Sequence, residues 1–133
     1  PYRYSECFTV HQEQAETTVY RLGDRKPAIV ISYGWDPASV VAMYVARHGS
    51  RVHHTAYYTP DILSTVAVQR TRGIAFTTPE IIGSPERGLY QIFTAPSPHH
   101  FEITEYIERF GGFTGFFDAG NVGDLMSSTR PFS

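Results

Sequence analysis

The stretch TVYRLGDRKP, residues 18–27, decides the fold that we expect, because a short apolar strand here carries an arginine into a charged turn. Branched and aromatic side chains at 18–20 suit a half-buried strand. Gly23 and Pro27 then break the pattern and end the strand. Arg21, at the strand end, presents a planar fork of donors that suits a phosphate or a carboxylate. The alternative for Arg21 is a surface ion pair with Asp24.

The surroundings of this arginine favour ligand binding, because three blocks of sequence together resemble one protein family. The first block runs without a gap from Tyr20 to Trp35 and holds a Tyr-Arg strand end, an arginine and proline turn, and a glycine followed by a large apolar residue. The second block is AFTT at 75–78, and the third is LYQIFTAP at 89–96. In this order the blocks resemble the ADP-ribosyltransferase toxins of the heat-labile enterotoxin and pertussis toxin type.

The resemblance implies a compact α+β fold of two small sheets that form a cleft for NAD, with N-terminal helices packed beside the sheets. It implies that Arg21 binds a phosphate or ribose of NAD. It also implies that the hydroxyls of Thr77 and Thr78 brace the same cleft. NAD would be a substrate, and the enzyme would be a glycosyltransferase that passes ADP-ribose to a protein.

The catalytic residue of the resembled family is a glutamate in a Glu-x-Glu or Gln-x-Glu pair on a late strand, where it stabilises the cation left by departing nicotinamide. Here the glutamates are Glu102, Glu105 and Glu108, three apart. If this segment is a strand, Glu105 shares a face with apolar neighbours, a setting typical of functional carboxylates. If a helix begins at Thr104, Glu105 and Glu108 are first-turn acids favoured by the helix dipole. Glu105 is the candidate catalytic residue, and both conformations stay open.

The remaining secondary structure follows from periodicity and from turn residues. Asp36 and Pro37 begin a helix that Gly49 ends, and Pro60 and Asp61 open another. We expect helices at 28–31, 36–49, 62–69 and 79–82, and strands at 8–10, 74–78, 89–95 and, in the first alternative above, 101–109. The helix at 28–31 follows the toxin resemblance against the strand propensity of its residues. The strand at 89–95 is apolar on both faces, so we expect it at the centre of a sheet.

Length and charge limit the other classes of protein. The 133 residues suffice for a hydrophobic core, so we expect one domain over 1–133, with 1–16 and the partly mobile tail 118–133 at its periphery. A net charge of -2 gives no basic field for nucleic acid. No apolar run approaches the roughly 20 residues of a membrane span. We expect a monomer, in which the single cysteine, Cys7, is a buried thiol.

Metal binding is not expected. The pairs His53-His54 and His99-His100 are adjacent in sequence, so the side chains of each pair point apart on a strand. There is no phosphate loop, Gly-x-Gly-x-x-Gly fingerprint or nucleophile elbow either.

Two functions follow. The first is a secreted toxin or effector that uses NAD to modify a host protein, with Arg21, Thr77, Thr78 and Glu105 in the roles given above. The second, suggested by the missing glutamate pair, is a catalytically inactive effector that keeps the fold and binds a host protein. The start at Pro1 instead of a methionine suggests trimming, either of a signal peptide or by the experimenter.

Overall fold

The computed structural model describes residues 4–12, 14–23, 27–116 and 118–132. The chain divides into two compact units at Gly49, and the second unit is Ser50–Phe132. The expectation of a single domain over 1–133 stays a prediction. No helix in the described part of the chain is both long and apolar enough to cross a bilayer.

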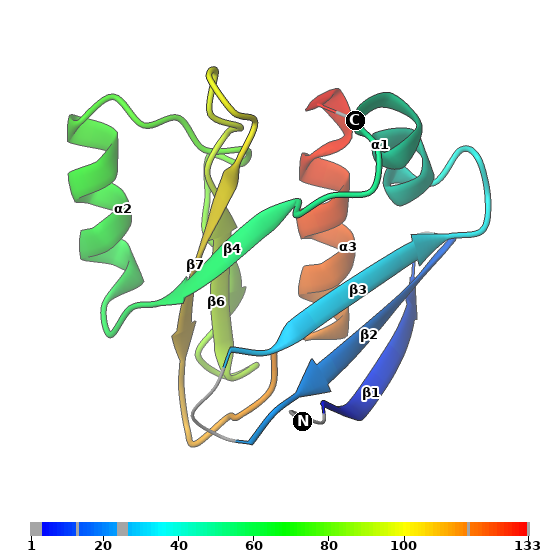
Figure 1. Ribbon diagram of the computed structural model, residues 1–133. Helices are drawn as coiled ribbons and strands as arrows, with labels where there is room; N and C mark the ends of the chain where they lie inside the picture. The colour runs from blue at the N-terminus through cyan, green and yellow to red at the C-terminus, as the bar shows by residue number, and fades with distance from the viewer. Residues whose placement is uncertain (1–3, 13, 24–26, 117, 133) are drawn as a thin grey trace. The chain divides into compact units, whose positions relative to one another are not determined.

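The first unit is an antiparallel three-stranded sheet with one helix (Figure 1). Its strands pair in the order β1-β2-β3, and the elements are β1 (Ser5–Gln12), β2 (Ala15–Arg21), β3 (Ile29–Gly34) and α1 (Val40–His48). Hydroxyl pairs tie the strands together, with Thr9 Oγ1 2.9 Å from Thr18 Oγ1 and Thr17 Oγ1 2.8 Å from Ser32 Oγ. The strand that the opening sequence predicts is therefore confirmed as β2.

Strand β3 corrects one expectation, since the helix predicted at 28–31 is wrong. Ile29, Val30 and Ile31 pair with Tyr20, Val19 and Thr18 of β2. Their branched side chains favour a strand, and this propensity prevails over the toxin resemblance. β3 lies at an edge of its sheet, and its side chains are largely exposed.

Helix α1 begins later than predicted. Ser39 caps it by accepting a hydrogen bond from the amide of Ala42 at 3.1 Å, whereas Asp36 accepts from Ala38 in a preceding turn. Gly49 ends the helix with a positive φ of 76°, a conformation that favours glycine, and its amide donates to the backbone oxygen of Val45. With no described helix before Val40, the expected N-terminal helices beside the sheets are wrong.

The second unit is a four-stranded sheet between two helices. The strand order is β4-β7-β6-β5, with β4 parallel to β7 and the other neighbours antiparallel. Its elements are β4 (His54–Tyr58), α2 (Ile62–Thr71), β5 (Ile82–Ser84), β6 (Leu89–Phe93), β7 (Ile103–Arg109), α3 (Ala119–Ser128) and the short 3-10 helix η1 (Arg130–Phe132). The internal position of β6 confirms the prediction from its two-sided apolar sequence.

Strand alternation gives this sheet two buried faces, each covered by one helix (Figure 1). On the α2 face, Ile92 packs with Ile62 and Val66. On the α3 face, Phe93 and Ile103 pack with Leu125. Residues two positions away from Phe93 and Ile103 share the α3 face, so β6 and β7 also turn their polar side chains at 91 and 105 toward α3.

Two other expectations in this unit are corrected. Instead of a strand, residues 74–78 form only one bridge, between Phe76 and Thr94. No helix forms at 79–82, because the chain enters β5 at Ile82. The tail contains α3, a helix that the sequence pattern does not predict, which begins where Asp118 accepts hydrogen bonds from the amides of Gly120 and Asn121.

Candidate functional site

The candidate site is centred on Glu105, in the middle of β7. Ile103, Glu105 and Ile107 are all buried on the α3 face, and Glu105 is 4% exposed. The strand conformation at this segment is confirmed and the helix alternative is wrong. Glu105 is thus a buried carboxylate between apolar neighbours, as the strand alternative predicted.

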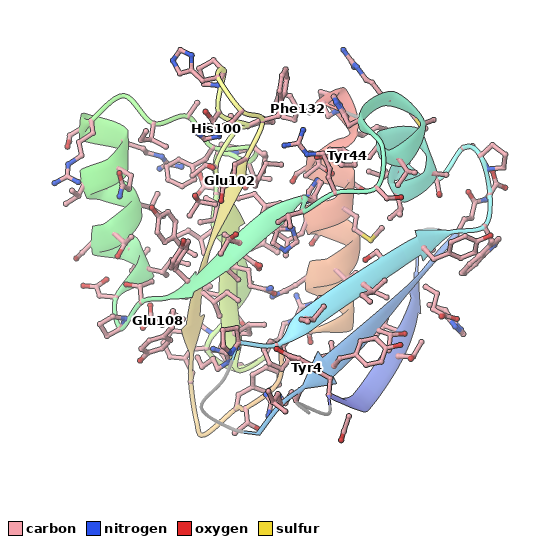
Figure 2. All side chains as sticks on the ribbon, viewed as in Figure 1. Tyr4, Tyr44, His100, Glu102, Glu108 and Phe132 are labelled. Atoms are coloured by element: carbon pink, nitrogen blue, oxygen red, sulfur yellow. The ribbon has the colours of Figure 1, made fainter. Side chains whose placement is uncertain are left out.

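The two other glutamates have separate positions. Figure 2 shows Glu102 and Glu108 toward opposite ends of β7. Glu108 Oε2 accepts a hydrogen bond from the amide of Ile62 at 2.8 Å and so helps to cap α2. Glu102 is exposed, with Thr55 Oγ1 3.4 Å from its carboxylate. Only Glu105, of these three, belongs to a buried polar cluster.

Two side chains from the flanking strands contact the Glu105 carboxylate, one on each oxygen. Gln91 Nε2, on β6, donates to Oε1 at 2.7 Å. His54 Nε2, at the start of β4, lies 3.2 Å from Oε2. The strand order β4-β7-β6 explains this arrangement, because β7 lies between the strands that carry the imidazole and the amide.

Neighbouring rings hold the imidazole of His54. Its Nδ1 lies 2.9 Å from Nδ1 of His53, so one of these two nitrogens carries the shared proton. The Phe93 ring lies against His54, with centroids 4.7 Å apart. The His54 side chain is 29% exposed, so the imidazole joins a buried carboxylate to the surface of this unit.

The cluster continues into α3 through Asn121. Its Nδ2 donates to Gln91 Oε1 at 2.9 Å, and the two amide side chains are 0% and 1% exposed respectively. Gln91 Nε2 also donates to the backbone oxygen of Phe116 at 3.3 Å. The arrangement offers an imidazole nitrogen and a carboxylate oxygen side by side, a pair that can transfer a proton or bind a cation.

Two of the predicted NAD-binding residues, Thr77 and Thr78, lie in the second unit but outside this cluster. Thr77 and Thr78 line a shallow groove of about 580 Å³ together with Asp124 and Ser128, and Glu105 is not part of its lining. Thr77 Oγ1 lies 2.9 Å from Ser128 Oγ, and Thr78 Oγ1 donates to the backbone oxygen of Glu80 at 2.8 Å.

Arg21 is the last residue of β2 and belongs to the first unit. The convergence of Arg21 with Thr77 and Glu105 on one concave surface stays a prediction, as do their binding and catalytic roles. The state of Cys7 also stays a prediction, since its side chain lies outside the described residues.

Sequence reasoning missed three members of the cluster. His54 is one of two adjacent histidines whose side chains are expected to point apart, and in β4 it lies beside Glu105 of β7. Gln91 was seen only as part of an apolar strand, and Asn121 lies in the segment expected to be mobile. One signal in the sequence could have found the cluster: Gln91 is a polar residue at the centre of a strand, 89–93, whose other residues are apolar or aromatic. Among the described residues, no three histidine, cysteine or acidic side chains form a metal-binding group.

The electrostatics of α3 are set at its first turn. The Arg87 guanidinium beside Asp118 lowers the pKa of that carboxyl below its usual value, and the amides of Asn121 and Gly120 lower it further. The same ion pair raises the pKa of Arg87. A charged Asp118 therefore caps the helix that carries Asn121.

Comparison with known proteins identifies a shared fold. No family model matches the chain, and no curated protein matches it either. Among solved structures, methylmalonyl-CoA epimerase from Streptomyces coelicolor has a TM-score of 0.66 at 21% identity, over 81% of both chains. The epimerase from Mycobacterium tuberculosis has a TM-score of 0.66 at 14% identity, over 81% of this chain and 73% of that one. A hypothetical protein from Bacillus halodurans has a TM-score of 0.68 at 15% identity, over 84% and 80%.

These neighbours overturn the resemblance to ADP-ribosyltransferase toxins. The two-sheet α+β fold is that of the methylmalonyl-CoA epimerases, so the expected ADP-ribosyltransferase-like fold is wrong. The assignment to a secreted enterotoxin-like toxin, and the alternative of an inactive effector, conflict with neighbours from a metabolic enzyme family. NAD binding, a host partner, a monomeric state and a secreted location stay predictions, because neither the described residues nor these neighbours test them.

Proposed function

We propose that the second unit binds a divalent metal ion through His54 Nε2 and Glu105 Oε2, as part of a site that acts on a carbonyl substrate. The observation that carries this proposal is the 3.2 Å separation of these two atoms on neighbouring strands. A bound ion would polarise the substrate carbonyl and so make the proton on the adjacent carbon more acidic.

The spacing of the two atoms suits neighbouring ligands of one ion. Two ligand atoms about 2.1 Å from an ion, at an angle of about 100° to each other, are about 3.2 Å apart. Imidazole nitrogen and carboxylate oxygen are common ligands of divalent first-row metals. Two protein ligands leave coordination positions for water, substrate or further side chains.

The hydrogen bonds around His54 allow both a metal-free and a metal-bound state. If His53 donates to His54 Nδ1, then His54 Nε2 carries a proton and donates it to Glu105. If His54 Nδ1 donates to His53 instead, the lone pair of Nε2 faces the carboxylate, and a cation between them removes the repulsion. The hydrogen bond on the far nitrogen thus orients the imidazole as a ligand.

The substrate class is suggested by the fold. Epimerase neighbours have been solved with methylmalonyl-CoA or with 2-nitronate-propionyl-CoA. Both are acyl thioesters of coenzyme A. We take an acyl thioester with a removable proton beside its carbonyl as the substrate class for this chain.

The test combines metal titration with an exchange assay. Isothermal titration with Co²⁺ or Zn²⁺ should give one site in the native chain. Binding should be weaker by more than about 100-fold in His54→Ala or Glu105→Ala, because each variant loses a ligand, whereas loss of a residue that only supports a ligand costs about 10- to 100-fold. His100→Ala, an exposed histidine outside the cluster, is the matched control and should bind as the native chain does.

The metal-loaded protein is then incubated with methylmalonyl-CoA in deuterium oxide, and deuterium uptake at the carbon beside the thioester is followed by mass spectrometry. Uptake that depends on Glu105 supports the substrate class. Metal binding that His54→Ala leaves intact would contradict the proposed site.

A further inference from the structure

A chain of two side-chain amides connects the C-terminal helix to the candidate site. Asn121 Nδ2 donates to Gln91 Oε1 at 2.9 Å, and Gln91 Nε2 donates to Glu105 Oε1 at 2.7 Å. All three residues are buried. We call Asn121 and Gln91 the amide chain.

The direction of each hydrogen bond in the amide chain is fixed. An ionised carboxylate only accepts, so Gln91 must turn Nε2 toward Glu105. The backbone oxygen of Phe116, which also only accepts, lies on the same side of Gln91. Gln91 Oε1 therefore faces α3, and Asn121 must turn Nδ2 toward it, where Nδ2 also lies 3.5 Å from the backbone oxygen of Leu89.

This orientation of the Asn121 amide leaves its oxygen, Oδ1, without a hydrogen bond among the described residues, although Oδ1 is buried. A buried acceptor without a partner destabilises the folded state, because it has lost its hydrogen bonds to water, whereas an apolar side chain of similar shape avoids this loss. Packing of α3 against the sheet does not by itself account for an asparagine at this position. The hydrogen bond that Asn121 Nδ2 donates to Gln91 accounts for the asparagine.

We propose that Gln91, held by Asn121, is the positioning residue of the candidate site. By occupying Oε1 of Glu105, Gln91 turns Oε2 toward His54, in the direction where the proposed function places the metal ion. This inference rests on the proposed function for its consequence on metal binding. The orientation of the carboxylate in the metal-free protein does not depend on it.

The test uses Gln91→Met and Asn121→Leu, which keep side-chain size and remove the donors. Metal titration should show affinity about 10- to 100-fold weaker in Gln91→Met, the range found when a partner of a metal ligand is lost. The double variant should bind no more weakly than Gln91→Met alone, because Asn121 acts through Gln91. A purely structural role for both residues predicts additive losses.

A second measurement needs no metal. The ring nitrogens of His54 are observed by ¹⁵N NMR and assigned by their absence in His54→Ala. In the native chain Nε2 should show a hydrogen bond to the carboxylate, and this shift should change in Gln91→Met and in Asn121→Leu. Thr94→Val is the matched control, since it removes a partly buried hydrogen bond beside the same strands, the one that the Thr104 amide donates to Thr94 Oγ1 at 3.0 Å. It should leave the His54 signals unchanged.

The outcomes separate the two proposals. If the native chain binds no metal but the His54 signals still move in both variants, the proposed function fails and the positioning role stands. If Gln91→Met and Asn121→Leu leave the His54 signals as in the native chain, the positioning role is overturned, whatever the native chain binds.

Discussion

Residues of the same type differ in this chain because strand alternation and strand ends place them in different surroundings. Glu105 faces α3 and is buried, whereas Glu108 caps α2. The contact of Asn121 with the sheet also depends on its surroundings, because the Asn121 amide lies against a residue that has no side chain. That residue is Gly83, with φ of 101°. A Cβ on Gly83 would lie 2.0 Å from the backbone oxygen of Leu89 and 2.7 Å from Asn121 Nδ2.

We therefore expect Gly83→Ala to destabilise the protein more than a comparable glycine substitution elsewhere. Gly73→Ala is the matched control, because Gly73 also has a positive φ, 82°, but no atom lies within 4 Å of its added Cβ. The control should lose about 1–2 kcal/mol from backbone strain alone. Gly83→Ala should lose about 1–3 kcal/mol more from the clash. Urea unfolding of both variants measures the difference, and equal losses would contradict this account of Gly83.

The sequence could predict the surroundings of Glu105 within its own strand but not its partners on the neighbouring strands. Alternation alone placed Glu105 among apolar neighbours, once the segment was taken as a strand. It could not supply Gln91 or His54 as partners, because contacts across strands depend on the register of pairing. The sequence holds no local mark of the pairing Phe93 with Glu105 or Ala56 with Glu105.

Among the secondary-structure elements, α3 depends on its first turn for its start. Asp118 accepts hydrogen bonds from Gly120 and Asn121 and pairs with Arg87. These contacts lower the pKa of Asp118 from an ordinary value of 3.8. A group with a lowered pKa in the folded state stabilises the protein above its unfolded pKa, and this stabilisation is lost as the pH falls through the lowered value.

We expect the stability difference between the native chain and Asp118→Asn to shrink as the pH falls below about 4. Asparagine still caps a helix but carries no charge, so the variant lacks both the titration and the ion pair with Arg87. The measurement is the free energy of unfolding in urea at several pH values from 6 down to the acid limit of folding. A difference that stays constant through this range would show that the charge of Asp118 does not stabilise α3.

Local signals predicted some elements well. The Asp61 cap marked α2, and its side chain accepts from the amide of Ser64 at 2.9 Å. β-branched residues marked β3, and the error there came from following a family resemblance over propensity. The tail was misjudged because its glycine and serine content outweighed the single capping aspartate. A helix of modest propensity is stabilised here by packing of Leu125, which no local pattern reveals.

For the whole molecule, the distribution of buried side chains indicates how the chain folds. Both clusters of buried apolar residues described above lie within Ser50–Phe132. The four-stranded sheet also has a helix from the same unit on each face. The second unit thus has the parts of an independent folding unit.

We expect a fragment of residues 50–132 to fold without residues 1–49. Its far-ultraviolet circular dichroism should show helix and strand, and its thermal unfolding should be one cooperative transition. The intact chain is the reference. A broad, gradual transition in the fragment would mean that its core is completed by the first 49 residues.

The fold class lay partly within reach of the sequence, since alternating helices and strands indicated a mixed α and β protein. The family did not. Short blocks such as AFTT at 75–78 agree with many folds, and here that block forms only one bridge to Thr94. Strand order within each sheet depends on contacts between distant residues, which a pattern of short motifs does not fix.

The parallel pairing of β4 with β7 has a consequence for synthesis on the ribosome. β4 lies at the edge of its sheet and pairs with β7 alone, so His54 has no strand beside it until the last strand of the sheet has left the exit tunnel. A nascent chain that ends before Ile103 contains His54 but lacks Glu105, the carboxylate that the imidazole contacts in the complete protein. The imidazole and the carboxylate therefore meet late in biogenesis, and an incompletely made chain that lacks β7 does not form the pair.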